Sequence, residues 1–281
     1  MEFYIPVIDL SEPYDVICSK VKYACENVGF LTLKNHGIDD TKLFEISQNF
    51  FKLPNEEKMF LARNKWNSDN PNEYRGYFPS SVYGKEGLDL ADPLLTNTEL
   101  EKNRYPISWN KNVIDSIDDY FDILHTLGYF LYGIVNENSD NKLKRPDCMS
   151  TLRFNYYPGG IKPVEISGKQ QLSCEEHFDS GLFTILFIDS YGGLEIQNPK
   201  DGIWHKVPYV KNHLIVNTGK ALEIISNGKY PATNHRVTYC EDKRISIPFF
   251  FEPSNNYMIG KYTYKEYLDN RCKIFKEYEK V

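Results

Sequence analysis

The second half of the chain restricts the possible folds most. After residue 150, short runs rich in β-branched and aromatic residues alternate with turn-forming pairs such as Gly192-Gly193 and Asn227-Gly228. Seven or eight short strands at this spacing are typical of a jelly roll or another sandwich-like barrel. The predicted strands span residues 152–157, 182–188, 194–197, 204–207, 214–217, 236–239 and 244–251.

Helical patterns surround this β-rich part. Apolar residues recur at helical spacing over 17–28, 43–50 and 113–135, and Thr263 and Glu266 form a capping-box pair at the start of a last helix. We therefore predict an α+β, mainly β fold, with flanking N-terminal, central and C-terminal helices. We expect a single domain of four parts: 1–110 (N-terminal helices and lid), 111–149 (scaffold helix and loop), 150–253 (jelly-roll core) and 254–281 (C-terminal helix).

Composition narrows the possible partners. The 281 residues are 41% hydrophobic, which is enough for a packed core, and the net charge of -6 with no long basic run argues against a nucleic-acid surface. A small-molecule substrate is the expected partner, and the oligomeric state is open. Six scattered cysteines without a CxxC pair favour a reducing compartment. No segment reaches the ~20 apolar residues of a membrane helix, so we expect a cytoplasmic protein.

Three residues form a candidate metal site. In an extended segment His177 and Asp179 would point to the same face, and His235 is the candidate for the third ligand. Two imidazoles and one carboxylate leave coordination positions open, as in non-haem Fe(II) oxygenases. A single histidine in a strand is more often structural, and this is the expected role of the other four: His36, His125, His205 and His213.

A second polar pair lies in the last predicted strand. Arg244 and Ser246 share one strand face, and a charged group in such a strand needs a partner. A ligand carboxylate would match the planar guanidinium, with the hydroxyl as second donor. The alternative partner is an internal carboxylate such as Glu223.

Residues 64–110 lack periodicity, and we expect a lid or substrate-facing wall there. Within 74–95, glycines and prolines argue against a regular element, while Arg75, Tyr77 and Tyr83 could contact substrate. The alternative is that Arg75 pairs with a nearby acid and the tyrosines pack on the scaffold helix.

Two groups of motifs together point to one enzyme family. The first group is HFDSGLFTILF, GGLEIQNPKDGIWHKVP, HLIVNTGKALEIISNGKYPATNHRV and RISIPFF. The second is IPVIDLS, GFLTLKNHGI, FFKLPNEEK, RGYFP and LRFNYYP. They resemble the core and the N-terminal signatures of the Fe(II)- and 2-oxoglutarate-dependent dioxygenases of the isopenicillin N synthase-like superfamily, and the likeness spans nearly the whole chain.

The resemblance implies a double-stranded β-helix core with Fe(II) held by His177, Asp179 and His235. It also implies that 2-oxoglutarate chelates the iron and meets Arg244 and Ser246 through its far carboxylate. The family's further cosubstrate contacts match two residues of NYYP, Tyr157 and Asn155. The implied reaction consumes O2, releases succinate and CO2, and by default hydroxylates the substrate.

Two departures from the family keep other functions open. Phe178 stands where the family commonly has Thr or another small or polar residue. The interval from His235 to Arg244 is one residue shorter than in many plant members and resembles that of isopenicillin N synthase, which uses no 2-oxoglutarate. One alternative is therefore an oxidase that takes all electrons from a substrate whose carboxylate meets Arg244 and Ser246. A second alternative is a binding protein without catalysis. It is disfavoured because the triad of His177, Asp179 and His235 is intact.

Overall fold

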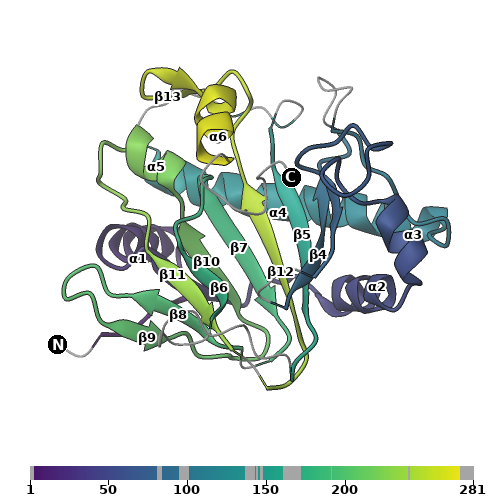
Figure 1. Cartoon of the computed structure of the whole chain (residues 1–281). Coiled ribbons are helices and arrows are strands. Elements are labelled where there is room, and N and C mark those ends of the chain that lie inside the picture. The colour runs from purple at the N-terminus through teal and green to yellow at the C-terminus, as the bar shows by residue number, and fades with distance from the viewer. Residues whose placement is uncertain are drawn as a thin grey trace.

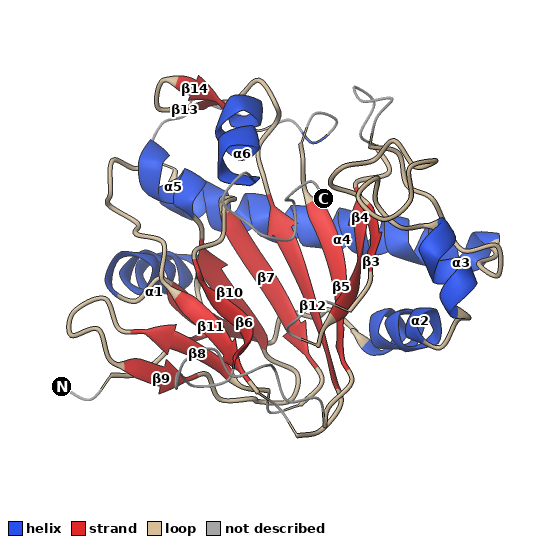
Figure 2. Cartoon of the chain, viewed as in Figure 1, coloured by secondary structure: helices blue, strands red, loops and turns tan. Residues whose placement is uncertain are grey.

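The computed structural model describes residues 3–80, 84–94, 101–136, 143, 145, 148–160, 172–190, 192–239 and 241–272. A large sheet forms the centre of the molecule, with a smaller sheet on one side and helices on the other (Figures 1 and 2). This arrangement is the predicted mainly β fold with flanking helices.

The large sheet has eight strands in the order β1-β2-β10-β7-β12-β5-β4-β3. All neighbours in it are antiparallel except β1 and β2. The strands, in sheet order, are β1 (Val7–Asp9), β2 (Phe30–Lys34), β10 (Leu214–Thr218), β7 (Phe183–Ile188), β12 (Arg244–Phe251), β5 (Thr151–Tyr157), β4 (Glu86–Ala91) and β3 (Gly76–Phe78).

The small sheet has four antiparallel strands in the order β6-β11-β8-β9. They are β6 (Leu172–His177), β11 (His235–Thr238), β8 (Leu194–Gln197) and β9 (Trp204–Lys206). A separate hairpin pairs β13 (Met258–Ile259) with β14 (Tyr262–Thr263) just before the C-terminal helix.

Six helices complete the described fold: α1 (Tyr14–Asn27), α2 (Thr41–Phe51), α3 (Asn55–Phe60), α4 (Lys111–Val135), α5 (Lys220–Ile225) and α6 (Tyr264–Cys272). The long α4 crosses the back of the large sheet (Figure 2). The capping box at α6 is formed in both directions. The Thr263 amide donates to Glu266 Oε2 at 2.9 Å, and the Glu266 amide donates to Thr263 Oγ1 at 3.3 Å.

Two apolar cores follow from the alternation of side chains along the strands. On β12, Ile247 and Phe249 point to the helices, and the Phe249 ring meets Phe121 of α4 at 5.7 Å between centroids. A smaller core between the two sheets includes Phe30 and Ile196. The space between the sheets therefore also receives the alternate residues of β12 and β5, and these include the polar residues Arg244, Ser246 and Asn155.

Most predicted elements are confirmed to within one or two residues, but the segment 74–95 is a correction. It contains β3 and β4, so the prediction that it holds no regular element is wrong. Leu88 and Leu90 are buried on either side of Asp89, and β4 pairs with β5 from the second half of the chain. The helix α5 and the strand β6 were also missed.

Strands from residues 1–110 and from 150–253 share the large sheet, and on this ground we retain the single domain as a proposal. Among the described residues no helix combines the length and hydropathy needed to cross a membrane. Four cysteines that the structure describes are free thiols: Cys18, Cys25, Cys148 and Cys174.

Candidate functional site

The two histidines of the triad meet across the small sheet. His177 ends β6, His235 begins β11, and the two are direct partners in the antiparallel register. Asp179 lies in the turn after β6 rather than in a strand, so the expectation of strand alternation between His177 and Asp179 is corrected. The Nε2 atoms of both histidines lie 3.7 Å from Asp179 Oδ1, and all three donor atoms lie within 4.8 Å of one another.

Backbone carbonyls orient both imidazole rings. His177 Nδ1 lies 2.8 Å from the Glu175 carbonyl oxygen, and His235 Nδ1 lies 3.1 Å from that of Thr233. A carbonyl only accepts, so in the neutral form of each ring Nδ1 carries the proton and Nε2 keeps the lone pair. Both lone pairs are therefore available on the side of Asp179, as metal ligands require.

Two buried donors orient Asp179. Thr184 Oγ1 donates to Asp179 Oδ2 at 2.6 Å and Asn217 Nδ2 donates to the same oxygen at 2.7 Å, which leaves Oδ1 for a metal. Thr184 and Asn217 are partners in the pairing of β7 with β10. Sequence reasoning missed them. The available signal was a polar residue inside each of the apolar runs FTILFI and LIVNT.

Each member of the triad shifts the pKa of at least one other member. Burial, together with His177, lowers the pKa of His235. Burial also opposes the charge on His177, but Cys174 and Asp179 outweigh it and raise the pKa of His177. For Asp179 burial acts upward, yet the two imidazoles outweigh it and lower its pKa. The carboxylate is therefore ionised at neutral pH. An Fe(II) ion fits two imidazole nitrogens and one carboxylate oxygen, and its binding would displace the extra proton that the raised pKa leaves on His177.

The predicted cosubstrate residues form a buried polar wall on the large sheet. Arg244 pairs with Tyr157 and Ser246 pairs with Asn155 in the register of β12 and β5, and Asn155 Nδ2 donates to Ser246 Oγ at 3.4 Å. The Arg244 guanidinium carbon lies 4.3 Å from the centre of the Tyr157 ring. A Cβ on Gly192 would lie 1.9 Å from Arg244 Nη1, so a larger residue at 192 would require the guanidinium to move.

The guanidinium of Arg244 has hydrogen-bond donors that no described residue uses. The residue is 4% exposed, and its Nε and Nη1 atoms are buried with no hydrogen-bond partner among the described residues. Glu223, the alternative partner, instead accepts from Lys220 Nζ and from the Ala232 amide, each at 2.7 Å. A buried guanidinium with unused donors fits a ligand carboxylate such as the far end of 2-oxoglutarate.

Two residues of the expected substrate wall are buried in packing contacts, although their partners are neither the acid expected for Arg75 nor the scaffold helix expected for Tyr77. Arg75 is buried and its Nη2 donates to the Met149 carbonyl oxygen at 2.7 Å. Tyr77 is buried, and its hydroxyl donates to Glu86 at 2.5 Å. Tyr83 lies outside the described residues.

A buried charge cluster lies on the same side of the sheet as the cosubstrate residues. Arg153, on the same face of β5 as Asn155, donates to Asp89 from Nε at 2.6 Å and from Nη2 at 2.9 Å. Arg63 also bonds Asp89. The shared carboxylate ties the segment before β3 to the middle of the sheet.

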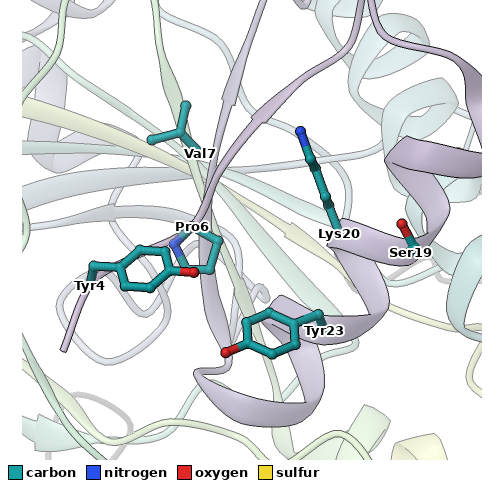
Figure 3. Close-up of a pocket in the computed structure, with 6 residues that line it drawn as sticks. All are labelled: Tyr4, Pro6, Val7, Ser19, Lys20 and Tyr23. Carbon is teal, nitrogen blue, oxygen red and sulfur yellow. The ribbon is translucent and has the colours of Figure 1, made fainter. Parts of the chain in front are cut away.

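Two surface pockets lie at other places. One, of about 300 Å³, lies between the N-terminal segment and α1, where Tyr4, Pro6 and Val7 face Ser19, Lys20 and Tyr23 (Figure 3). The other, of about 550 Å³, is lined by residues 34–41 and 211–213. Neither pocket is lined by a residue of the triad or by one of the predicted cosubstrate residues on β5 and β12.

Known proteins match this chain over most of its length. Residues 148–253 match the model of the 2OG-Fe(II) oxygenase superfamily, and residues 5–115 match that of the N-terminal region of non-haem dioxygenases in morphine synthesis. Protein SRG1 of Arabidopsis thaliana is 32% identical over 267 residues, which cover 88% of this chain and 71% of the relative. The chain belongs to the 2OG-Fe(II) oxygenase superfamily. It is accordingly a dioxygenase that uses Fe(II) and 2-oxoglutarate.

Further matches support membership of the superfamily and the fold. A flavonol synthase/flavanone 3-hydroxylase of Petunia hybrida is 31% identical over 277 residues, covering 91% of this chain and 75% of the relative. A full-length Neurospora crassa protein, crystallised in complex with alpha-KG, superimposes with a TM-score of 0.79 at 24% identity, covering 95% of each chain. At this identity the structural likeness bears on the fold alone.

Proposed function

We propose that this 2OG-Fe(II) oxygenase hydroxylates a small organic molecule at an iron ion held by His177, Asp179 and His235. The observation that supports the residue assignment is the convergence of their three donor atoms within 4.8 Å. Relatives named as feruloyl CoA ortho-hydroxylase and flavonol synthase/flavanone 3-hydroxylase support the substrate class. A cytoplasmic location and the absence of a nucleic-acid partner stay predictions from composition.

The cosubstrate is assigned to the wall opposite the triad. The Arg244 guanidinium binds the far carboxylate of 2-oxoglutarate, and the Ser246 hydroxyl donates a second hydrogen bond to it. Tyr157 covers the flat face of the guanidinium and, with Asn155, lines the same face of the sheet. When bound, iron and 2-oxoglutarate supply the oxidation, with one oxygen atom of O2 entering succinate and the other the hydroxylated product, while CO2 leaves.

The groups around the triad orient its three side chains. Thr184 and Asn217 hold one oxygen of Asp179, so that the other stays aimed at the metal. The bonds from each Nδ1 to a carbonyl fix the histidine tautomers, so Nε2 is the atom that each neutral ring presents to the metal. The buried apolar residues between the sheets exclude water and strengthen the bond from Arg244 to a carboxylate.

The sequence alone left open an oxidase on the same fold that needs no 2-oxoglutarate. The observation behind it is the short interval between His235 and Arg244. In that reaction Arg244 and Ser246 would bind the substrate's own carboxylate. Membership of the 2OG-Fe(II) oxygenase superfamily argues against this alternative.

One experiment tests the residue assignment and the choice between the two reactions. Calorimetric titration of Mn(II) into wild type and Asp179→Ala should show binding in the wild type and its loss in the variant. Undiminished Mn(II) binding by the variant would contradict the triad. Succinate release that depends on added 2-oxoglutarate would support the first reaction, and full substrate oxidation without 2-oxoglutarate would support the second.

A further inference from the structure

The loop that carries Asp179 is held from two sides. We call residues 178–181 the ligand loop. On one side, backbone amides at the start of α5 bond it: the Lys220 amide donates to the Asp179 carbonyl oxygen at 2.8 Å, and that of Ala221 donates to Ser180 at 3.1 Å. These bonds come from the backbone, so they do not depend on which side chains α5 carries.

On the other side, α6 bonds the ligand loop through two side chains. The Tyr267 hydroxyl donates to the Ser180 carbonyl oxygen at 3.1 Å. Arg271 Nη2 donates to the Phe178 carbonyl oxygen at 3.0 Å. The two acceptors belong to the residues immediately before and after Asp179, so α6 bonds the chain on both sides of this ligand.

The position of α6 is set independently of the ligand loop. Tyr264, in its first turn, is fully buried, and its hydroxyl donates to Glu252 Oε1 at 2.7 Å, just beyond the end of β12. The hairpin of β13 and β14 and the capping box fix the entry to the helix. Figure 1 shows α6 above the ends of β7 and β12, on the same side of the molecule as α5.

We propose that α6 is a positioning element of the metal centre, with Tyr267 and Arg271 fixing the ligand loop so that Asp179 Oδ1 faces the two histidines. The inference rests on the proposed function, because it assigns Asp179 to the metal. Hydrogen bonds to a loop that carries a ligand raise metal affinity by reducing the freedom that the loop loses on binding. Linkage is reciprocal, so a bound metal must also stabilise the docked helix.

The test uses mild variants of the full chain. Tyr267→Phe removes only the hydroxyl, Arg271→Met removes the donor, and Arg271→Lys keeps a charged donor. Lys265→Ala is the matched control, because Lys265 lies on the same helix and pairs only at the surface with Asp269. The readouts are the Kd of Mn(II) by calorimetry, and hydrogen exchange of the α6 amides with and without Mn(II).

We expect Tyr267→Phe and Arg271→Met each to raise the Mn(II) Kd about three- to tenfold, and the double variant about ten- to a hundredfold. Arg271→Lys should recover part of the loss, and the Lys265 variant should bind as wild type does. Mn(II) should slow exchange in α6 of the wild type, and less so in the double variant.

The opposing results are distinct. If wild type and double variant bind Mn(II) with equal Kd, the positioning role of α6 is wrong while the triad stands. If wild type binds no Mn(II), the metal centre itself is wrong and the role of α6 falls with it. A double variant that melts earlier but keeps the wild-type Kd would show a merely structural helix, which also overturns the proposal.

Discussion

Replacing Arg244 should separate ligand binding from folding. Arg244 is buried, stacks on Tyr157, and has two nitrogen atoms without a hydrogen-bond partner in the described part of the chain. A buried guanidinium with unused donors costs free energy in the absence of a ligand, and Arg244→Met removes that cost together with the cation–π contact. These effects oppose each other, so without 2-oxoglutarate the free energy of unfolding should change by less than about 1 kcal/mol.

The effect on ligand binding should be much larger. A charge-assisted hydrogen bond contributes about 1.5–3 kcal/mol, so losing one from Arg244 raises the Kd of 2-oxoglutarate roughly 10- to 150-fold. At a concentration of 100 times the wild-type Kd, 2-oxoglutarate should stabilise wild type by about 2.7 kcal/mol. The same concentration should stabilise a variant with a hundredfold higher Kd by only about 0.4 kcal/mol.

Urea unfolding with and without 2-oxoglutarate, under Mn(II) and without O2, measures both quantities. Arg236→Met is the matched control, because Arg236 pairs with Glu195 at 2.8 Å and covers Trp204 on the small sheet. It should lower the free energy of unfolding but keep the full gain from 2-oxoglutarate. An undiminished gain in Arg244→Met would refute the assignment of Arg244 to the cosubstrate.

Three further predictions concern stability. Asp89→Asn leaves two buried guanidinium groups without their shared carboxylate and should lower the free energy of unfolding by about 3–5 kcal/mol in urea, whereas Asp269→Asn at the surface should change it little. Burial raises the pKa of Glu252 from its usual 4.5 to about 7, so the folded state holds a proton that the unfolded state releases in this window, and stability falls as pH rises through it. Glu252→Gln should remove this pH dependence and be up to about 3 kcal/mol more stable than wild type at pH 8, and a variant that keeps the wild-type pH profile would contradict it. Arg75→Ala should lower the melting temperature and leave the ratio of product to succinate unchanged, because Arg75 bonds a buried carbonyl. Succinate release without product at an unchanged melting temperature would instead support a substrate contact by Arg75.

Local patterns in the sequence were sufficient for much of the fold. Alternation in RISIPFFF predicts both that β12 is a strand and that Arg244 and Ser246 share a face, because side-chain direction in a strand depends only on position along it. The capping box at Thr263 and the long helix α4 are also predicted from local sequence, because both depend on the spacing of residues a few positions apart. The residue types at 177, 179 and 235 likewise restrict the chemistry, because few side chains bind iron.

Tertiary structure decided which distant segments meet. His235 faces His177 only because β11 pairs with β6, and Asp179 is oriented by Thr184 and Asn217 from two other strands. The strand β4 was not predicted because its pairing with β5, rather than its own composition, makes it a strand. Neither the pairing of distant strands nor the contact of α6 with the ligand loop is encoded in local periodicity. Both depend on how the whole chain packs. The sequence alone therefore determined the candidate ligand types and most elements, while the structure determined their geometry.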